Sequence, residues 1–178
     1  MKAYPGAASK DEQVAEMIRV NHAGEYGAQR IYQGQLAVLG NHECAPMLHH
    51  MAEQEKEHLE TFEKLMQERR VRPSALMPLW HVGGWLLGAG TALIGKEAAM
   101  ACTVAVEKEI SEHYKSQEET LDEDEAELKS TIERFRAEEE EHHDIGLEQD
   151  ADNAPLSPLL QAGIGLLTRT AVAIAKKV

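Results

Sequence analysis

The sequence predicts an all-α protein, a four-helix bundle that carries two further apolar helices, from three observations. Ala, Glu and Leu are abundant, while aromatic residues make up only 4% of the 178 residues, which favours helices over sheets. No sustained segment alternates polar and apolar residues as a strand would, whereas apolar residues recur every three to four positions along most of the chain. Glycine and proline divide this pattern into helical segments. We expect residues 1–178 to form a single domain.

Glycine and proline residues mark the expected ends of the helices. Gly40 ends the first segment, Pro73 follows the second, and Pro155 and Pro158 precede the last. The N-terminal residues 1–10 are expected to be a flexible arm. The six expected helices cover residues 11–39, 45–70, 79–94, 96–119, 123–148 and 159–177.

Charge and cysteine content narrow the class of protein. Lys and Arg number 18 against 31 Asp and Glu, a formal charge of −13, and because such a surface repels phosphate no nucleic-acid partner is expected. Cys44 and Cys102 lie far apart and are interpreted as reduced packing residues. Residues 1–10 resemble neither a secretory signal nor an Arg-rich transit peptide, so the chain is expected to be made where it works or to have lost a transit peptide. The acidic stretch 118–127 is expected to be a solvated turn and helix start.

Each of four amphipathic helices has an apolar stripe that is interrupted near its middle by a glutamate. Packing the stripes inward would bury four carboxylates, and a buried unpaired carboxylate costs several kcal/mol. No Lys or Arg lies on these faces beside the glutamates, so bound metal is the direct compensation. In the second and fifth helices a histidine follows the glutamate by three residues, on the same helix face. The candidate metal ligands are Glu25, Glu55, His58, Glu107, Glu139 and His142.

The order of these residues repeats. Glu55 follows Glu25 by 55 − 25 = 30 residues, and Glu139 follows Glu107 by 139 − 107 = 32. One Glu from each of two helices and Glu-x-x-His from each of two others is the ligand pattern of ferritin-like di-metal bundles. Glu140 and His143 share the same spacing as an alternative pair, but the apolar register of the fifth helix favours Glu139 and His142.

Carboxylate and imidazole ligands without thiolate exclude a structural zinc site of the cysteine kind and leave iron or manganese. Iron is favoured because two Fe(II) ions can deliver two electrons to O₂. Tyr32 and Tyr114 each follow a candidate glutamate by seven residues and are weaker catalytic candidates. His22, His113 and Asp144 are candidates to orient the ligands.

Two apolar segments, residues 79–94 and 159–177, leave two alternatives open. They cover the bundle core, or they rest on a membrane, with Trp80 and Trp85 at the interface, and admit a lipid-like substrate. The first segment has 16 residues, fewer than the ~20 that a membrane span needs.

Several motifs closely resemble the demethoxyubiquinone hydroxylases of ubiquinone biosynthesis, over roughly residues 14–178. The similar segments are MIRVNHAGEYGA at 17–28, VRP at 71–73, LMPLW at 76–80, GAGTAL at 88–93, AMACTVAVE at 99–107 and EHHDIGL at 141–147. The resemblance implies a di-iron monooxygenase that uses O₂ to hydroxylate the ring of a polyprenyl methoxy-benzoquinol, demethoxyubiquinol, in the penultimate step of ubiquinone synthesis. It assigns two Fe²⁺ ions to the six candidate ligands.

The resemblance also suggests NADH as the ultimate electron source and a lipid-binding accessory protein as a partner. It implies a peripheral protein on the cytoplasmic face of a bacterial membrane, or alternatively on the matrix face of the mitochondrial inner membrane. A homo-oligomer is left open. The main rival hypothesis is a non-enzymatic iron-storage bundle; a second is a structural membrane-docking bundle whose glutamates are solvated.

Overall fold

A computed structural model describes residues 9–177 and confirms the all-α prediction. The two short 3₁₀ helices are η1 (Glu123–Glu125) and η2 (Ala151–Asn153). The six α-helices are α1 (Lys10–Leu39), α2 (Ala45–Arg69), α3 (Met77–Ile94), α4 (Lys96–Glu118), α5 (Ala126–Glu148) and α6 (Ser157–Ala175).

The helix ends differ from the predicted ends in a few places. The expected fifth helix, 123–148, begins as the separate turn η1. Both α3 and α6 begin two residues early because a proline is accepted in their first turn, where a helix lacks intrahelical N–H partners. The predicted arm lies mostly outside the described residues. Its last residue, Lys10, already belongs to α1, and Ser9 caps that helix in a capping box with Glu12.

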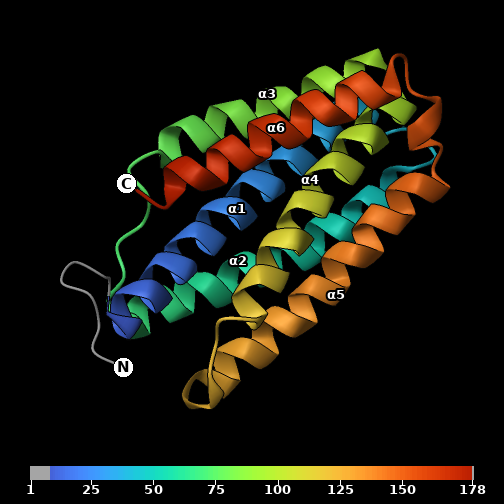
Figure 1. Ribbon diagram of the computed structural model, residues 1–178. Coiled ribbons are helices and arrows are strands. Elements are labelled where there is room, and N and C mark those ends of the chain that lie inside the picture. Colours follow the sequence, from blue (N-terminus) through green and yellow to red (C-terminus); the bar gives the residue numbers. More distant parts are fainter. Residues whose placement is uncertain (1–8, 178) are drawn as a thin grey trace.

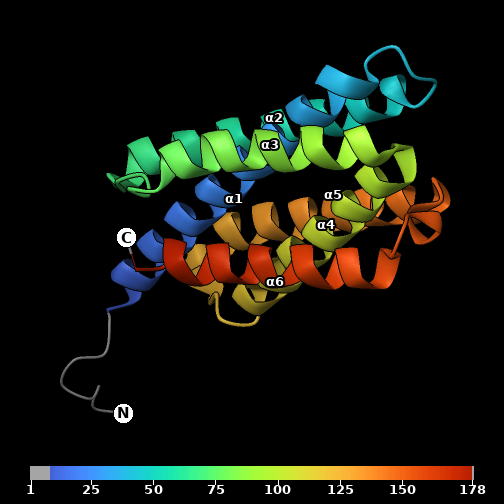
Figure 2. The ribbon, with the colours of Figure 1, turned by 90° about the horizontal axis from the view of Figure 1, so that it is seen from above.

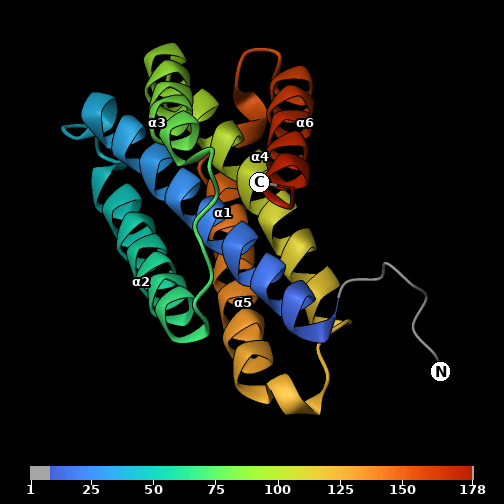
Figure 3. The ribbon, with the colours of Figure 1, turned by 90° about the vertical axis from the view of Figure 1, so that its left-hand side faces the viewer.

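The helices form three layers of two (Figure 3). Helices α2 and α5 lie on one side, α1 and α4 lie in the middle, and α3 and α6 lie on the other side, as Figures 1 and 2 also show. Within each half of the chain the middle helix packs against its two successors: α1 against α2 and α3, and α4 against α5 and α6. The sequence predicted a repeat of two helix pairs, whereas the structure extends it to two units of three helices.

Helix α3 approaches α1 closely through glycines. A Cβ atom on Gly88 would lie 2.0 Å from the carbonyl oxygen of Ile31, and one on Gly34 would lie 2.3 Å from that of Trp85. These glycines let the two backbones approach more closely than any larger side chain would allow. The outer helix is thereby held at a fixed position above the bundle.

The acidic stretch 118–127 contains the expected turn and helix start, and ion pairs with neighbouring helices add to it. Arg69 of α2 holds Glu125 through two hydrogen bonds of 2.8 and 2.7 Å, and Arg136 of α5 holds Glu118 at 2.6 Å. Lys10 of α1 pairs with Asp122 at 2.9 Å. Basic residues from three helices therefore hold the connection between α4 and α5 in place. The prediction for the cysteines is confirmed, since Cys44 and Cys102 are both free and buried.

Candidate metal centre

The bundle brings six carboxylate and imidazole side chains together in its interior. All six are at most 1% exposed. They form two overlapping groups in which the facing atoms lie within 4.8 Å of one another. The groups are Glu25, Glu55, His58 and Glu139, and Glu55, Glu107, Glu139 and His142.

The overlap distinguishes two kinds of glutamate. Glu55 and Glu139 belong to both groups, whereas Glu25 and Glu107 each belong to one. The shared pair comes from α2 and α5, the helices that also carry the histidines. The cluster is thus arranged as two adjacent positions with two carboxylates between them.

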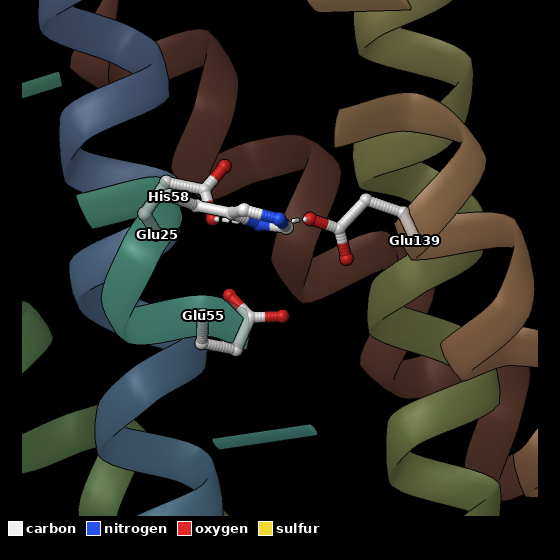
Figure 4. A group of neighbouring side chains, drawn as sticks. All are labelled: Glu25, Glu55, His58 and Glu139. Atoms are coloured by element: carbon white, nitrogen blue, oxygen red, sulfur yellow. Dashed lines mark ion pairs between the residues drawn. The ribbon is translucent and has the colours of Figure 1, made fainter. Parts of the chain in front are cut away.

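Both histidines direct the same ring nitrogen into the cluster. His58 Nδ1 lies 3.3 Å from Glu25 Oε2 and 3.0 Å from Glu139 Oε1, and Figure 4 shows its ring between these two carboxylates. His142 Nδ1 lies 3.2 Å from Glu55 Oε1 and 3.4 Å from Glu139 Oε2.

Many inward atoms of the cluster make no hydrogen bond. They include both Nδ1 atoms, both oxygens of Glu55 and of Glu139, and one oxygen each of Glu25 and Glu107. Buried polar atoms without a partner are rare because each costs its full desolvation energy. Eight such atoms converging on one space fit a pair of cations, which would satisfy all of them together.

The ionisation of the metal-free cluster is strongly perturbed. Burial, with the neighbouring carboxylate Glu139, raises the pKa values of Glu55 and Glu107 well above the ordinary range. Burial also opposes charging of His58, but its contacts with Glu139 and Glu25 prevail and raise its pKa to about 12. Burial alone would raise the pKa of Glu139. The contacts with His142 and His58 outweigh burial and lower this pKa to about 2. The cluster therefore holds protons that a metal must displace.

Two tyrosines cross between the halves of the cluster. Tyr32 of α1 donates a hydrogen bond to Glu107 of α4 over 2.7 Å, and Tyr114 of α4 donates one to Glu25 of α1. Burial is the main reason that the pKa values of both phenols are raised, so they remain donors at neutral pH. Each tyrosine holds the carboxylate of the opposite half.

A further polar layer repeats the same symmetry. Gln35 Nε2 lies 3.3 Å from Thr103 Oγ1, and Gln117 and Asn21 exchange two hydrogen bonds of 2.7 and 2.8 Å. Asn21, Tyr32 and Gln35 precede Thr103, Tyr114 and Gln117 by 82 residues, the separation of Glu25 from Glu107. These partners were not predicted from the sequence, although their constant separation of 82 residues is a signal that could have indicated them.

The outward nitrogens of the two histidines also have partners that the sequence did not predict. His58 Nε2 lies 2.6 Å from Glu138 Oε2, and His142 Nε2 lies 3.0 Å from Gln54 Oε1. Gln54 and Glu138 are separated by 84 residues, as are Glu55 and Glu139.

The residues proposed from the sequence to orient the ligands lie elsewhere. Asp144 contacts His143 at 3.0 Å, and His113 contacts Gln117 at 2.8 Å. His22 is buried, and its Nδ1 makes no hydrogen bond. Within residues 9–177, no hydrogen bond joins any of the three to a ligand. Asp144 lies two positions after His142 and His113 lies six after Glu107, offsets that turn both side chains to another side of the helix.

The alternative register of α5 turns outward. Glu140 is exposed and pairs with Arg136 at 2.8 Å, while the neighbouring positions Glu139 and His142 are fully buried. The apolar stripe of this helix therefore distinguishes between two chemically identical pairs.

An apolar groove of about 230 Å³ is lined by residues of α1, α3, α4 and α6. Trp80 and Leu167 form part of its walls, and Ala28 and Val106 form part of its floor. Ala28 lies one turn after Glu25 on α1, and Val106 immediately precedes Glu107 on α4. The floor of the groove is therefore built by the same helix turns that carry two of the cluster glutamates.

The fold and the cluster define a ferritin-like di-metal carboxylate protein. The particular family follows from comparison with known proteins. The family model for the ubiquinone biosynthesis protein COQ7 matches residues 12–175, and the chain belongs to this family.

Curated relatives come from mitochondria and from bacteria. The chain is 57% identical over 160 residues to the NADPH-dependent 3-demethoxyubiquinone 3-hydroxylase of Bos taurus mitochondria, covering 85% of this chain and 74% of the relative. It is 50% identical over 175 residues to the 3-demethoxyubiquinol 3-hydroxylase of Rhodospirillum rubrum, covering 98% and 82%. It is 41% identical over 179 residues to the mitochondrial 5-demethoxyubiquinone hydroxylase of Saccharomyces cerevisiae, covering 91% and 77%.

Proposed function

We propose that this protein is a 3-demethoxyubiquinol 3-hydroxylase, which inserts one oxygen atom of O₂ into the ring of a polyprenyl methoxy-benzoquinol during ubiquinone synthesis. The observation that carries the proposal is the buried cluster of four glutamates and two histidines beneath an apolar groove. Family membership adds the reaction, since the similar proteins carry hydroxylase names. The cluster, the groove and the family match all support the same reaction.

We further propose that the cluster holds two iron ions. Glu25, Glu55 and His58 would hold one ion, and Glu107, Glu139 and His142 would hold the other. Glu55 and Glu139 are common to both groups and would be within reach of both ions. The donor set of oxygen and imidazole nitrogen suits iron, and the unpaired inward atoms supply the reason for a cation to enter.

When bound, the irons supply the electrons that divide O₂ between a new ring hydroxyl group and water. The residues of the chain provide the conditions. The apolar groove takes the prenyl-bearing ring and keeps water from it, because its lining offers water few hydrogen-bond partners. Tyr32 and Tyr114 keep Glu107 and Glu25 in position, and the phenols remain protonated beside them. We expect Tyr32→Phe and Tyr114→Phe to lower kcat roughly tenfold while KM for the quinol is retained.

The groove opens in the layer of α3 and α6, which points to a membrane-embedded substrate. Both helices expose leucines, and α6 is the one helix in residues 9–177 that is long and apolar enough to cross a membrane. However, α6 packs along α4, and Arg169 of α6 pairs with Glu109 there. We propose that α3 and α6 lie in the membrane interface and do not span it. In a bacterium this would be the cytoplasmic face of the membrane, and in a mitochondrion the matrix face of the inner membrane.

The electron donor is proposed to be a reduced nicotinamide nucleotide. The resemblance seen in the sequence suggests NADH, whereas the bovine relative is named as NADPH-dependent. A lipid-binding accessory protein would deliver the quinol, and self-association remains compatible with the fold.

The deciding experiment loads the purified protein anaerobically with Fe(II), then adds a short-chain demethoxyquinol and O₂. We expect two irons per chain and a product heavier by one oxygen atom, with label from ¹⁸O₂ and not from H₂¹⁸O. Parallel assays with NADH and NADPH assign the donor. Uptake of many irons per chain without product would support the storage hypothesis, and no metal binding would support the structural hypothesis.

A further inference from the structure

The two halves of the metal centre differ in the residues that contact the Nε2 atoms of the two histidines. Position 138 holds a glutamate that contacts His58 Nε2, and the equivalent position 54 holds a glutamine that contacts His142 Nε2. The glutamate and tyrosine positions at the cluster keep identical residues: Glu25 with Glu107, Glu55 with Glu139, and Tyr32 with Tyr114. One histidine therefore has a carboxylate behind it and the other has a neutral amide.

The carboxylate is held firmly in place. Glu138 Oε1 accepts a hydrogen bond from Arg134 at 3.1 Å, and Arg134 also pairs with Glu57 of α2 at 2.8 Å. The His58 ring packs on Phe135, with ring centroids 4.0 Å apart. These contacts fix both members of the pair. A mobile surface carboxylate would not keep such a fixed position.

The outer partner determines how each histidine presents itself to a metal. A carboxylate or an amide oxygen only accepts hydrogen bonds, so each Nε2 carries the hydrogen and each Nδ1 offers its lone pair inward. A carboxylate acceptor withdraws that hydrogen more strongly than an amide does, which makes the imidazole a stronger metal ligand. His58 should therefore bind metal more tightly than His142.

We propose that Glu138 and Gln54 are positioning residues that make the two metal positions inequivalent, so that the position of Glu25, Glu55 and His58 fills first. The inference rests on the proposed metal centre. It adds an order of filling and names the two residues, outside the set of six ligands, that impose it.

The test is an anaerobic titration of the metal-free protein with Co(II), followed by proton NMR. The exchangeable Nε2–H protons of cobalt-bound histidines appear far from the protein envelope, and loss of a signal in His58→Ala or His142→Ala assigns each. We expect the His58 signal to appear first and the His142 signal with the second equivalent. The two dissociation constants should differ by roughly tenfold or more.

Isosteric exchanges then test the cause. Glu138→Gln should make the two dissociation constants more nearly equal by weakening metal binding at His58. Gln54→Glu should do the same by strengthening metal binding at His142. The double exchange should reverse the order of filling, a result that loss of structure cannot imitate. Glu141→Gln, an exposed position on the same helix with the same change of charge, should leave the order unchanged.

The outcomes separate this inference from the proposed function. Simultaneous filling in the wild-type protein, His142 filling first, or an unchanged gap in Glu138→Gln would overturn the inequivalence while leaving a two-metal centre. A protein that binds no cobalt would overturn the metal centre and this inference together.

Discussion

The interior of the bundle and its outer layer invert the usual placement of side chains. The interior buries four glutamates that are at most 1% exposed, while α3 and α6 leave leucines in the open, with Leu93 75% exposed and Leu159 69% exposed. Buried carboxylates and exposed hydrocarbon both cost free energy in water. Each arrangement would become favourable with the component proposed for it, a pair of cations in the interior and a lipid surface at the outer layer. The proposed metal centre and the proposed membrane face therefore lie at the two regions that are least favourable in water.

The largest effect is expected from removing a carboxylate shared by both metal groups. Glu139→Ala should abolish hydroxylation and reduce bound metal from two ions to fewer than one, because Glu139 belongs to both groups. Glu25→Ala should leave one position intact, since Glu25 belongs to only one. Metal analysis and product formation provide the measurement. The matched control is Glu140→Ala on the exposed side of α5, and equal metal loss in that control would contradict the assignment.

Introducing charged residues on the outer layer of α3 and α6 should weaken membrane binding without changing the metal centre. Leu86 and Leu166 are exposed on α3 and α6 and lie outside the groove lining. Burying one leucine is worth about 2 kcal/mol, so Leu86→Glu with Leu166→Glu should weaken binding to phospholipid vesicles at least ~100-fold. Metal content should not change.

The control for this experiment is Leu147→Glu, an exposed leucine on α5 that is 40% exposed. Vesicle co-sedimentation measures the binding. If the α5 variant lost as much binding as the double variant, α3 and α6 would not be the membrane face.

Metal-free protein should become less stable as pH rises. The pKa values of Glu55 and Glu107 are raised by burial above the ordinary value of 4.5, so the folded chain retains protons that the unfolded chain has lost. His58 acts in the same direction between its ordinary pKa of 6.5 and about 12. The free energy of unfolding should fall by about 1.4 kcal/mol per pH unit for each proton retained.

Urea denaturation of chelator-treated protein from pH 5 to pH 9 measures this slope. Glu55→Gln should flatten it and raise the stability of the metal-free protein at high pH, because a buried group that resists charging has been removed. A metal-free protein whose stability increases over this range would contradict the buried-proton account.

A smaller effect concerns how the outer layer is attached. Gly88→Ala should destabilise the fold by about 1–3 kcal/mol, because its Cβ would lie 2.0 Å from the Ile31 carbonyl oxygen. Gly90→Ala in the same helix meets open space and should stabilise it by up to ~1 kcal/mol through helix propensity. Thermal unfolding of both variants makes the measurement, and equal shifts would show that close contact between α1 and α3 is unimportant.

The sequence alone determined the helices and the six candidate ligands. Apolar periodicity is a local property of the chain, so it can be read without the tertiary structure. It predicted six helices with ends correct to within a few residues, and it predicted that Glu139 is buried while Glu140 is not. The repeated spacing of Glu and Glu-x-x-His indicated a two-metal site before any distance was known. The family motifs supplied the reaction.

Only the tertiary structure decided which residues meet across helices. The crossed contacts of Tyr32 and Tyr114, the sharing of Glu55 and Glu139, and the unequal partners Glu138 and Gln54 all join helices far apart in the chain. A periodic pattern fixes the face on which a residue lies, but not its height or its neighbour across the bundle, because these depend on how helices pack. The same reason explains why the groove between α3 and α6 became visible only when both helices were placed on α1 and α4.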